Sequence, residues 1–158
     1  MIHAVAHRTP LPSAQAQTSV HEASHAVASL VLGGDVLAVS ILPRRHQLGV
    51  QLGGCVSRVS LRSPLQRCAA AIVALAGGQA DRRVVGVYRP HRAQGDLFRV
   101  LRLVGDDPHL ISRLMRASDK LVDDCWPGIV RVAEALLVFG KLDGNEVRFA
   151  IGRKVARR

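Results

Sequence analysis

The chain has 158 residues, of which 48% are hydrophobic, 22% charged and 3% aromatic, which is typical of one folded domain. The apolar fraction excludes an intrinsically disordered chain, and the longest apolar runs, near residues 26–32 and 69–76, are far shorter than the roughly 20 residues of a membrane span. The opening MIHAVAHRTPLP lacks the pattern of a signal peptide, so we expect a cytoplasmic protein.

The net charge is +10, from 22 Lys and Arg against 12 Asp and Glu. Only the C-terminal GRKVARR forms a basic cluster, and one Trp, one Tyr and three Phe give little material for stacking on bases. A nucleic-acid partner is therefore not expected. The cysteines Cys55, Cys68 and Cys125 stand far apart with no CxxC, which favours reduced thiols over disulfides or a cysteine zinc site.

The first third of the chain predicts a helix followed by the sequence's only β-rich stretch. Residues 1–12 are expected to form a flexible arm. The apolar spacing over residues 13–32 is helical and ends at a pair of glycines. The β-branched run Val36–Leu42 predicts a strand that ends at Pro43, and residues 49–61 predict one or two further short strands.

The rest of the chain is predicted to be helical. Ser63-Pro64 and Asp107-Pro108 each pair an N-cap with a proline and so predict the start of a helix, and Pro127 predicts a break. The predicted helices cover residues 63–76 with a continuation to 85, 95–104, 107–125, 128–139 and 143–151. The expected fold class is mainly α, an array of about six helices with a small β-ribbon, in one domain over residues 13–152 followed by a basic tail at 153–158.

The first predicted helix contains the sequence His21-Glu22-Ala23-Ser24-His25. Histidines four residues apart lie on one face of a helix, so both imidazoles can bind one Zn²⁺. Glu22 stands beside them and can take a proton from a water whose pKa the metal lowers to about 7. This HExxH pattern predicts the chemistry of a zinc peptidase, against the alternative of ordinary polar residues on a partly exposed helix face.

A catalytic zinc site needs three protein ligands and an open fourth position. The extended pattern HExxHxxGxxH is excluded because Ala28 and Val31 occupy the positions of its Gly and its third His. The only later glutamates, Glu134 and Glu146, lie near the C-terminus. The candidates that remain for the third ligand are Asp96, Asp81 and His91.

The segment Ser19–Arg44, SVHEASHAVASLVLGGDVLAVSILPR, resembles the opening of the peptidase domain of the FtsH family of ATP-dependent zinc metalloproteases, in which an HEAGHA helix leads into a strand of the form KVTIIPRG. Three later segments are similar to that family in the same order: AAAIVALAGGQADR (69–82) to an ALGGRAAE-like motif, AQGDLFRVLRLV (93–104) to ASNDLERATRLA, and RVAEALLVFGKLDGNEVRFAI (131–151) to RLAEALLExExLDGEEV. The resemblance extends from about Ser13 to Gly152.

This resemblance implies an FtsH protease domain-like fold and a zinc metalloendopeptidase. It implies one Zn²⁺ held by His21, His25 and Asp96, with Glu22 as the catalytic base. Asp81 does not match the family's glutamate after the glycines cleanly, because Arg82 occupies the nearer position.

The chain also departs from the family's pattern. A serine replaces the glycine of HEAGH, and the connection between the ribbon and the next long helix is shorter than usual. No GxxxxGK[ST] motif occurs, so we expect a peptidase that is independent of ATP on its own and acts on peptides or unfolded proteins.

The strand over Val36–Leu42, and within it Val39, Ser40 and Ile41, is expected to offer an edge to which an extended peptide adds by main-chain hydrogen bonds; the alternative is plain core packing. Two other functions stay open. One is a non-catalytic, zinc-containing regulatory or binding module, and the other is a peptidase subunit that acts with a separate ATPase. No membrane partner is expected, and the sequence leaves the oligomeric state open.

Overall fold

The structure is a computed structural model that describes residues 13–46, 49–87 and 94–152. Its elements, in chain order, are α1 (Ala14–Val31), β1 (Asp35–His46), β2 (Gly49–Arg58), α2 (Pro64–Val85), α3 (Gln94–Val104), α4 (Pro108–Phe139), β3 (Lys141–Asp143) and α5 (Gly144–Gly152). The predicted arm (1–12), the predicted basic tail (153–158) and His91 lie outside the described residues.

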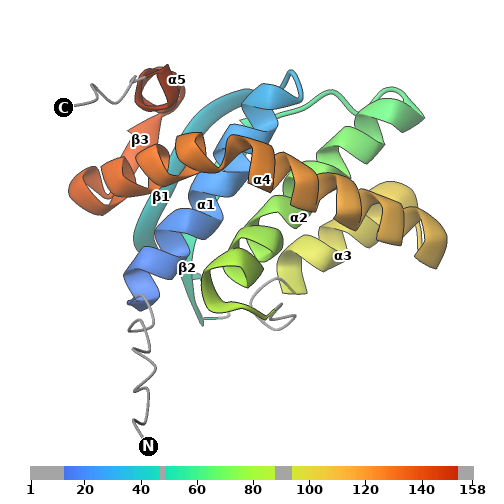
Figure 1. Ribbon diagram of the computed structural model, residues 1–158, viewed down its shortest axis with the longest axis horizontal. Coiled ribbons are helices and arrows are strands. Elements are labelled where there is room, and N and C mark those ends of the chain that lie inside the picture. Colours follow the sequence, from blue (N-terminus) through green and yellow to red (C-terminus); the bar gives the residue numbers. More distant parts are fainter. Residues whose placement is uncertain (1–12, 47–48, 88–93, 153–158) are drawn as a thin grey trace, which may run out of the picture.

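The mainly helical fold with a small antiparallel sheet is confirmed, and α1 lies at its centre. Helix α4 crosses one side of α1 and α2, while β1 and β2 lie behind α1 in the view of Figure 1. Ser13 caps the start of α1, because its hydroxyl accepts a hydrogen bond from the amide of Ala16 at 3.1 Å. A helix covered on several sides buries polar residues along with apolar ones, and this is where the predicted HExxH motif lies.

Two hydrophobic cores meet along α2. The first core joins buried side chains of α1, β1, α4 and α5 to Val73, Ala76 and Ala80 of α2. The second core is smaller and joins another side of α2 to α3 and to the first half of α4; its buried members are Ala71, Ala74, Leu75, Val100 and Leu114. Helix α2 therefore connects the packing of α1 to the packing of α3.

The described residues form five helices instead of about six, because the predicted break at Pro127 does not occur. A proline inside a helix removes one main-chain hydrogen bond. Tertiary packing outweighs this loss: Val122 and Ile129, on either side of the proline, are 1% and 0% exposed in the first core. Trp126, next to the proline, lies 4.6 Å below the guanidinium of Arg83 from α2.

The sheet has the order β2-β1-β3, which places β1 in the centre. Val39 pairs with Cys55 of β2 on one side and with Leu142 of β3 on the other. The expectation that Val39, Ser40 and Ile41 form a substrate-binding edge is therefore wrong. These three residues are 0%, 2% and 6% exposed and pack in the interior, which agrees with the alternative of plain core packing.

The sequence did not predict β3, since KLD has no strand pattern of its own. The strand exists because the chain, after the left-handed Gly140 at the end of α4, passes alongside β1. The amide of Ile41 donates to the Gly140 carbonyl at 2.9 Å. Strand β1 also runs past its predicted end, because a register irregularity between Ser40 and Pro43 accommodates the proline.

No helix within the described ranges is long and apolar enough to cross a membrane.

Candidate metal centre

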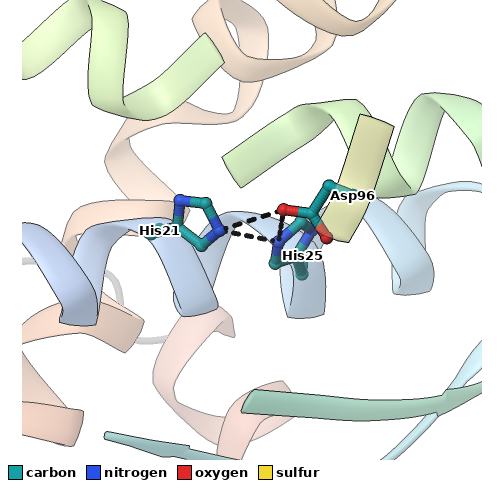
Figure 2. A group of neighbouring side chains, drawn as sticks. All are labelled: His21, His25 and Asp96. Carbon is teal, nitrogen blue, oxygen red and sulfur yellow. Dashed lines mark hydrogen bonds and ion pairs between the residues drawn. The ribbon is translucent and has the colours of Figure 1, made fainter. Parts of the chain in front are cut away.

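Helix α1 holds His21, Glu22 and His25 in the interior of the protein, with exposures of 9%, 7% and 8%. The two histidines are one helical turn apart and share one face. Figure 2 shows their rings side by side on α1, with Asp96 reaching toward them from α3. Two elements that are distant in the sequence thus contribute to one group.

Three ligand atoms converge in this group. The Nε2 atoms of His21 and His25 lie 3.1 Å apart. The Oδ2 atom of Asp96 lies 3.3 Å from Nε2 of His21 and 3.4 Å from Nε2 of His25. Ligand atoms about 2.0–2.2 Å from a tetrahedral metal are separated by about 3.3–3.6 Å, which is close to the observed separations, so the group could hold a metal ion.

In each histidine ring the Nδ1 atom is occupied by a hydrogen-bond partner on α2, which leaves the Nε2 atom available to a metal ion. Nδ1 of His25 lies 2.8 Å from the carbonyl oxygen of Val73, and Nδ1 of His21 lies 3.0 Å from Oδ2 of Asp81. A carbonyl only accepts, so Nδ1 of His25 carries the hydrogen and donates it. The neutral ring then presents a lone pair at Nε2, and two such lone pairs 3.1 Å apart need a cation or proton between them.

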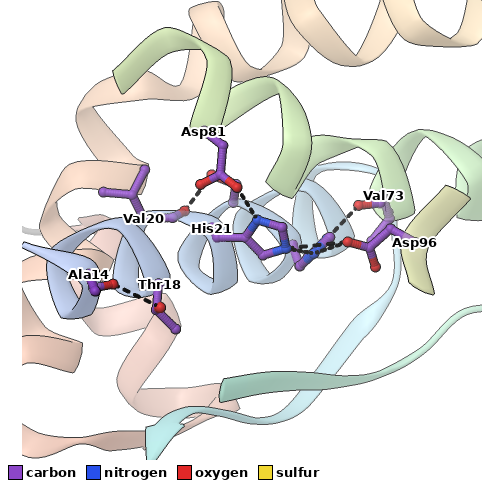
Figure 3. A network of polar contacts seen from close by, with 9 residues as sticks. Ala14, Thr18, Val20, His21, Val73, Asp81 and Asp96 are labelled. Atoms are coloured by element: carbon purple, nitrogen blue, oxygen red, sulfur yellow. Dashed lines mark hydrogen bonds and ion pairs between the residues drawn. The ribbon is translucent and has the colours of Figure 1, made fainter. Parts of the chain in front are cut away.

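One face of α2 provides this support. Val73, Gly77 and Asp81 are spaced four residues apart, so they lie in one row on the helix. Helix α2 runs antiparallel to α1, which brings Val73 to His25 and Asp81 to His21 (Figure 3). Two histidines that are four residues apart are therefore supported by two groups of α2 that are eight residues apart, with Gly77 midway between them.

Gly77 lies between these two contacts and leaves the space at the metal position open. A Cβ atom at this position would lie 2.5 Å from Nε2 of His21 and 2.6 Å from Nε2 of His25. Real Cβ atoms essentially never come that close, so any other residue would displace the histidines. The missing side chain is a further sign that the group is shaped around an ion.

Asp81 had been a candidate for the third ligand, and the structure places it elsewhere. It lies on the Nδ1 side of His21, away from the converging Nε2 atoms, where it orients the ring. Asp81 is 3% exposed, and its Oδ1 is buried without a hydrogen-bond partner among the described residues. The spacing of Asp81 from Gly77 could have signalled this role, had the pairing of α1 with α2 been known.

The other candidates are distant from the group. Glu146 caps α5, where its carboxylate accepts a hydrogen bond from the amide of Asp143 at 2.7 Å. Glu134 lines a separate groove of about 910 Å³ between the end of α4 and α5, beside Phe139 and Phe149. Neither glutamate can therefore serve as the third ligand of this group.

The group is strongly coupled by charge. Burial alone would lower the pKa of His21, but hydrogen bonds to Asp81 and Asp96 outweigh burial and raise the pKa to about 10. Burial would also lower the pKa of His25, but the hydrogen bond and the charge of Asp96 outweigh burial and raise this pKa. For Asp96, burial would raise the pKa, yet the two histidines hold it well below its usual range. The Asp96 carboxylate is therefore ionised, and it favours a positive charge on the histidines or between them.

Glu22 points to the sheet side of α1, against β2. Gly53 has a φ of +88°, and a Cβ atom there would lie 3.0 Å from Cγ and Oε1 of Glu22, so only glycine lets the strand pass this closely. Burial raises the pKa of Glu22 above its usual value, against the positive charges of His25 and His21. A buried carboxylate of raised pKa beside a cation site is suited to accept and return a proton.

Comparison with models of known protein families finds no match, and no curated protein matches the chain.

Proposed function

We propose that this protein is a zinc-dependent metalloendopeptidase with an FtsH-like peptidase domain. The observation that carries the proposal is the convergence of two Nε2 atoms and the Asp96 carboxylate within 3.4 Å of one another, beside a buried glutamate. Two imidazoles with one carboxylate, in a geometry that fits a tetrahedron and leaves room for a fourth ligand, are a donor set that suits zinc. In the HExxH sequence Glu22 directly follows the first histidine, which is the position of the base in zinc peptidases with this motif.

A bound zinc would polarise the scissile carbonyl and lower the pKa of a water molecule. His21, His25 and Asp96 would hold it, and Asp81 and the Val73 carbonyl would keep the two rings oriented. Glu22 would take the proton from the water and pass it to the leaving amine, acting first as base and then as acid.

Strand β2 is the element that supports an extended substrate. Among the described residues it is an edge strand, paired only with β1, and Gly53 on it lies against Glu22. A peptide that adds to the outer side of β2 by main-chain hydrogen bonds would run past this glutamate. This mode favours extended segments, so peptides and unfolded chains are the proposed substrates, presented directly or by a separate ATPase.

The test compares the wild type with Glu22→Gln, using zinc analysis and cleavage of unfolded casein and quenched peptides. We expect both proteins to bind one zinc per chain and only the wild type to cleave, because the substitution removes the base and leaves the ligands. Glu134→Gln, a distant glutamate on α4, is the control and should cleave as the wild type does. A wild type that binds zinc stoichiometrically and cleaves nothing would instead support a non-catalytic zinc-containing module.

A further inference from the structure

Helix α3, which provides Asp96, also carries an exposed arginine, Arg99, that the proposed mechanism does not use. Arg99 lies three residues after Asp96 on α3, so both side chains project from neighbouring positions on one face of the helix. The position of Asp96 is fixed by its contacts with His21 and His25. Arg99 is exposed, so its side chain lies at the surface of α3, about one helical turn from Asp96.

An independent observation places the charge of Arg99 near β2. Burial, together with the charge of Glu22, raises the pKa of the Cys55 thiol to about 12, and the charge of Arg99 acts in the opposite direction. Cys55 is two residues after Gly53 on β2, and the charge of Glu22 acts on it, so both residues belong to the part of β2 near Glu22. Arg99 and Glu22 thus both act on one point of β2 from different helices.

The backbones of α3 and β2 are not in contact. No Cα atom of α3 comes within 8 Å of a Cα atom of β2 in the described part of the chain. A strand added to a sheet edge takes up about 4.8 Å in the plane of the sheet. A peptide paired with the outer side of β2 would pass the part of the strand on which both Glu22 and Arg99 act.

Arg99 differs from the arginines that have structural partners. Arg82 and Arg83 pair with Asp119 and Asp123 of α4, and Arg148 pairs with Asp35. Arg99 has no ion-pair partner among the described residues, and the same holds for other exposed arginines. Arg99 differs from those arginines because it is only three residues from Asp96 on α3. A guanidinium recognises carboxylates through two parallel hydrogen bonds.

We propose that Arg99 is a specificity-determining residue that binds a carboxylate of the peptide substrate close to the scissile bond. This inference rests on the proposed peptidase function. The carboxylate comes either from an acidic side chain or from the C-terminus of a short peptide, and in both cases the preferred substrate is anionic.

The test digests a tryptic peptide library with the zinc-loaded enzyme and identifies cut sites by mass spectrometry. We expect Asp and Glu to be enriched at one position near the cut. Synthetic peptides with Glu or Gln at that position, each as free acid and as C-terminal amide, then separate the two sources. Because an exposed ion pair is weak, the expected preference in kcat/KM is about two- to fivefold, and added salt should reduce it.

Arg99→Gln should abolish the preference while leaving cleavage of the Gln amide peptide unchanged, and Arg99→Glu should reverse it. Arg102→Gln is the matched control: this exposed arginine is also on α3, about 9 Å along the axis from Asp96, and should keep the preference. Cleavage with no anionic preference, or a preference that survives Arg99→Gln, overturns the inference and leaves the peptidase proposal intact. Absence of any cleavage overturns both.

Discussion

The two histidines and the aspartate of the candidate metal centre are supported in different ways. His21 and His25 are on α1 in the first core, and each ring is oriented from behind by α2. Asp96 is on α3, a helix in which Val100 alone is fully buried and which depends on the smaller second core. The side chain of Asp96 is 27% exposed, against 11% for each histidine.

The histidine half of the centre is therefore held by more of the fold than the aspartate half, which comes from a less deeply packed helix. Helix α3 also has no Cα atom within 8 Å of α1 in the described ranges. The contact of Asp96 with the histidines therefore depends on α2, which both cores share. This asymmetry should be measurable as differences in metal affinity between variants of the two halves.

Asp96→Ala should cause the largest loss. Removing one ligand should cost more than the roughly 10–100-fold typical of an outer partner, so we expect zinc affinity to fall more than about 100-fold and cleavage to disappear. Because Asp96 also pairs with both histidines when no metal is bound, the thermal midpoint of the metal-free protein should fall as well. Competition with a chelating dye and circular dichroism measure the two quantities. Asp106→Ala is the control, and wild-type affinity in Asp96→Ala would place the third ligand elsewhere.

Gly77→Ala tests the histidine half. The added Cβ would lie 2.5 Å from Nε2 of His21, so the rings must move and zinc affinity should fall by about 10–100-fold. The matched control is Gly128→Ala in α4, where the Cβ would lie 3.7 Å from Ile151, an ordinary contact. That variant should bind zinc normally and gain up to about 1 kcal/mol from better helix propensity. Equal zinc affinities in the two variants would contradict the close approach at Gly77.

Leu75→Ala and Leu136→Ala separate the two cores. Both side chains are buried, at 1% and 0% exposure, and each truncation should cost about 2–5 kcal/mol of unfolding free energy. Only Leu75 lies in the second core beneath α3, so only its truncation should loosen Asp96 and weaken zinc binding, by about two- to fivefold. Denaturant melts and zinc titrations measure both effects. If Leu136→Ala weakens zinc binding as much as Leu75→Ala does, the two cores do not support Asp96 and the histidines differently.

The pH dependence of the metal-free protein should show the charge coupling. The pKa of His21 is raised from 6.5 to about 10, so its contribution to stability is complete below pH 6.5 and is lost as the pH rises toward 10. Zinc affinity should rise over the same range, because the metal displaces the histidine protons. Urea midpoints between pH 6 and 10 test this, and Asp81→Asn should flatten the curve by removing a carboxylate that raises this pKa.

Much of the fold follows from local patterns. Ser63 and Asp107 cap the helices that the sequence predicted from them, because capping depends on residues within one turn. Local rules also led to the wrong prediction at Pro127, since its cost is offset by packing against helices that are distant in the sequence. Strand β3 was missed for the same reason: it is defined by pairing with β1.

For the candidate site, the local sequence pattern was enough to place His21, Glu22 and His25 on one helix, and the spacing of four residues gives the two histidines a common face. It left three candidates for the third ligand, and only the resemblance to a family singled out Asp96. The tertiary structure decided that Asp96 meets the histidines, that Asp81 orients His21, and that Gly77 leaves the ion its space. These relations join residues on three helices, and no local pattern encodes how α1, α2 and α3 pack together.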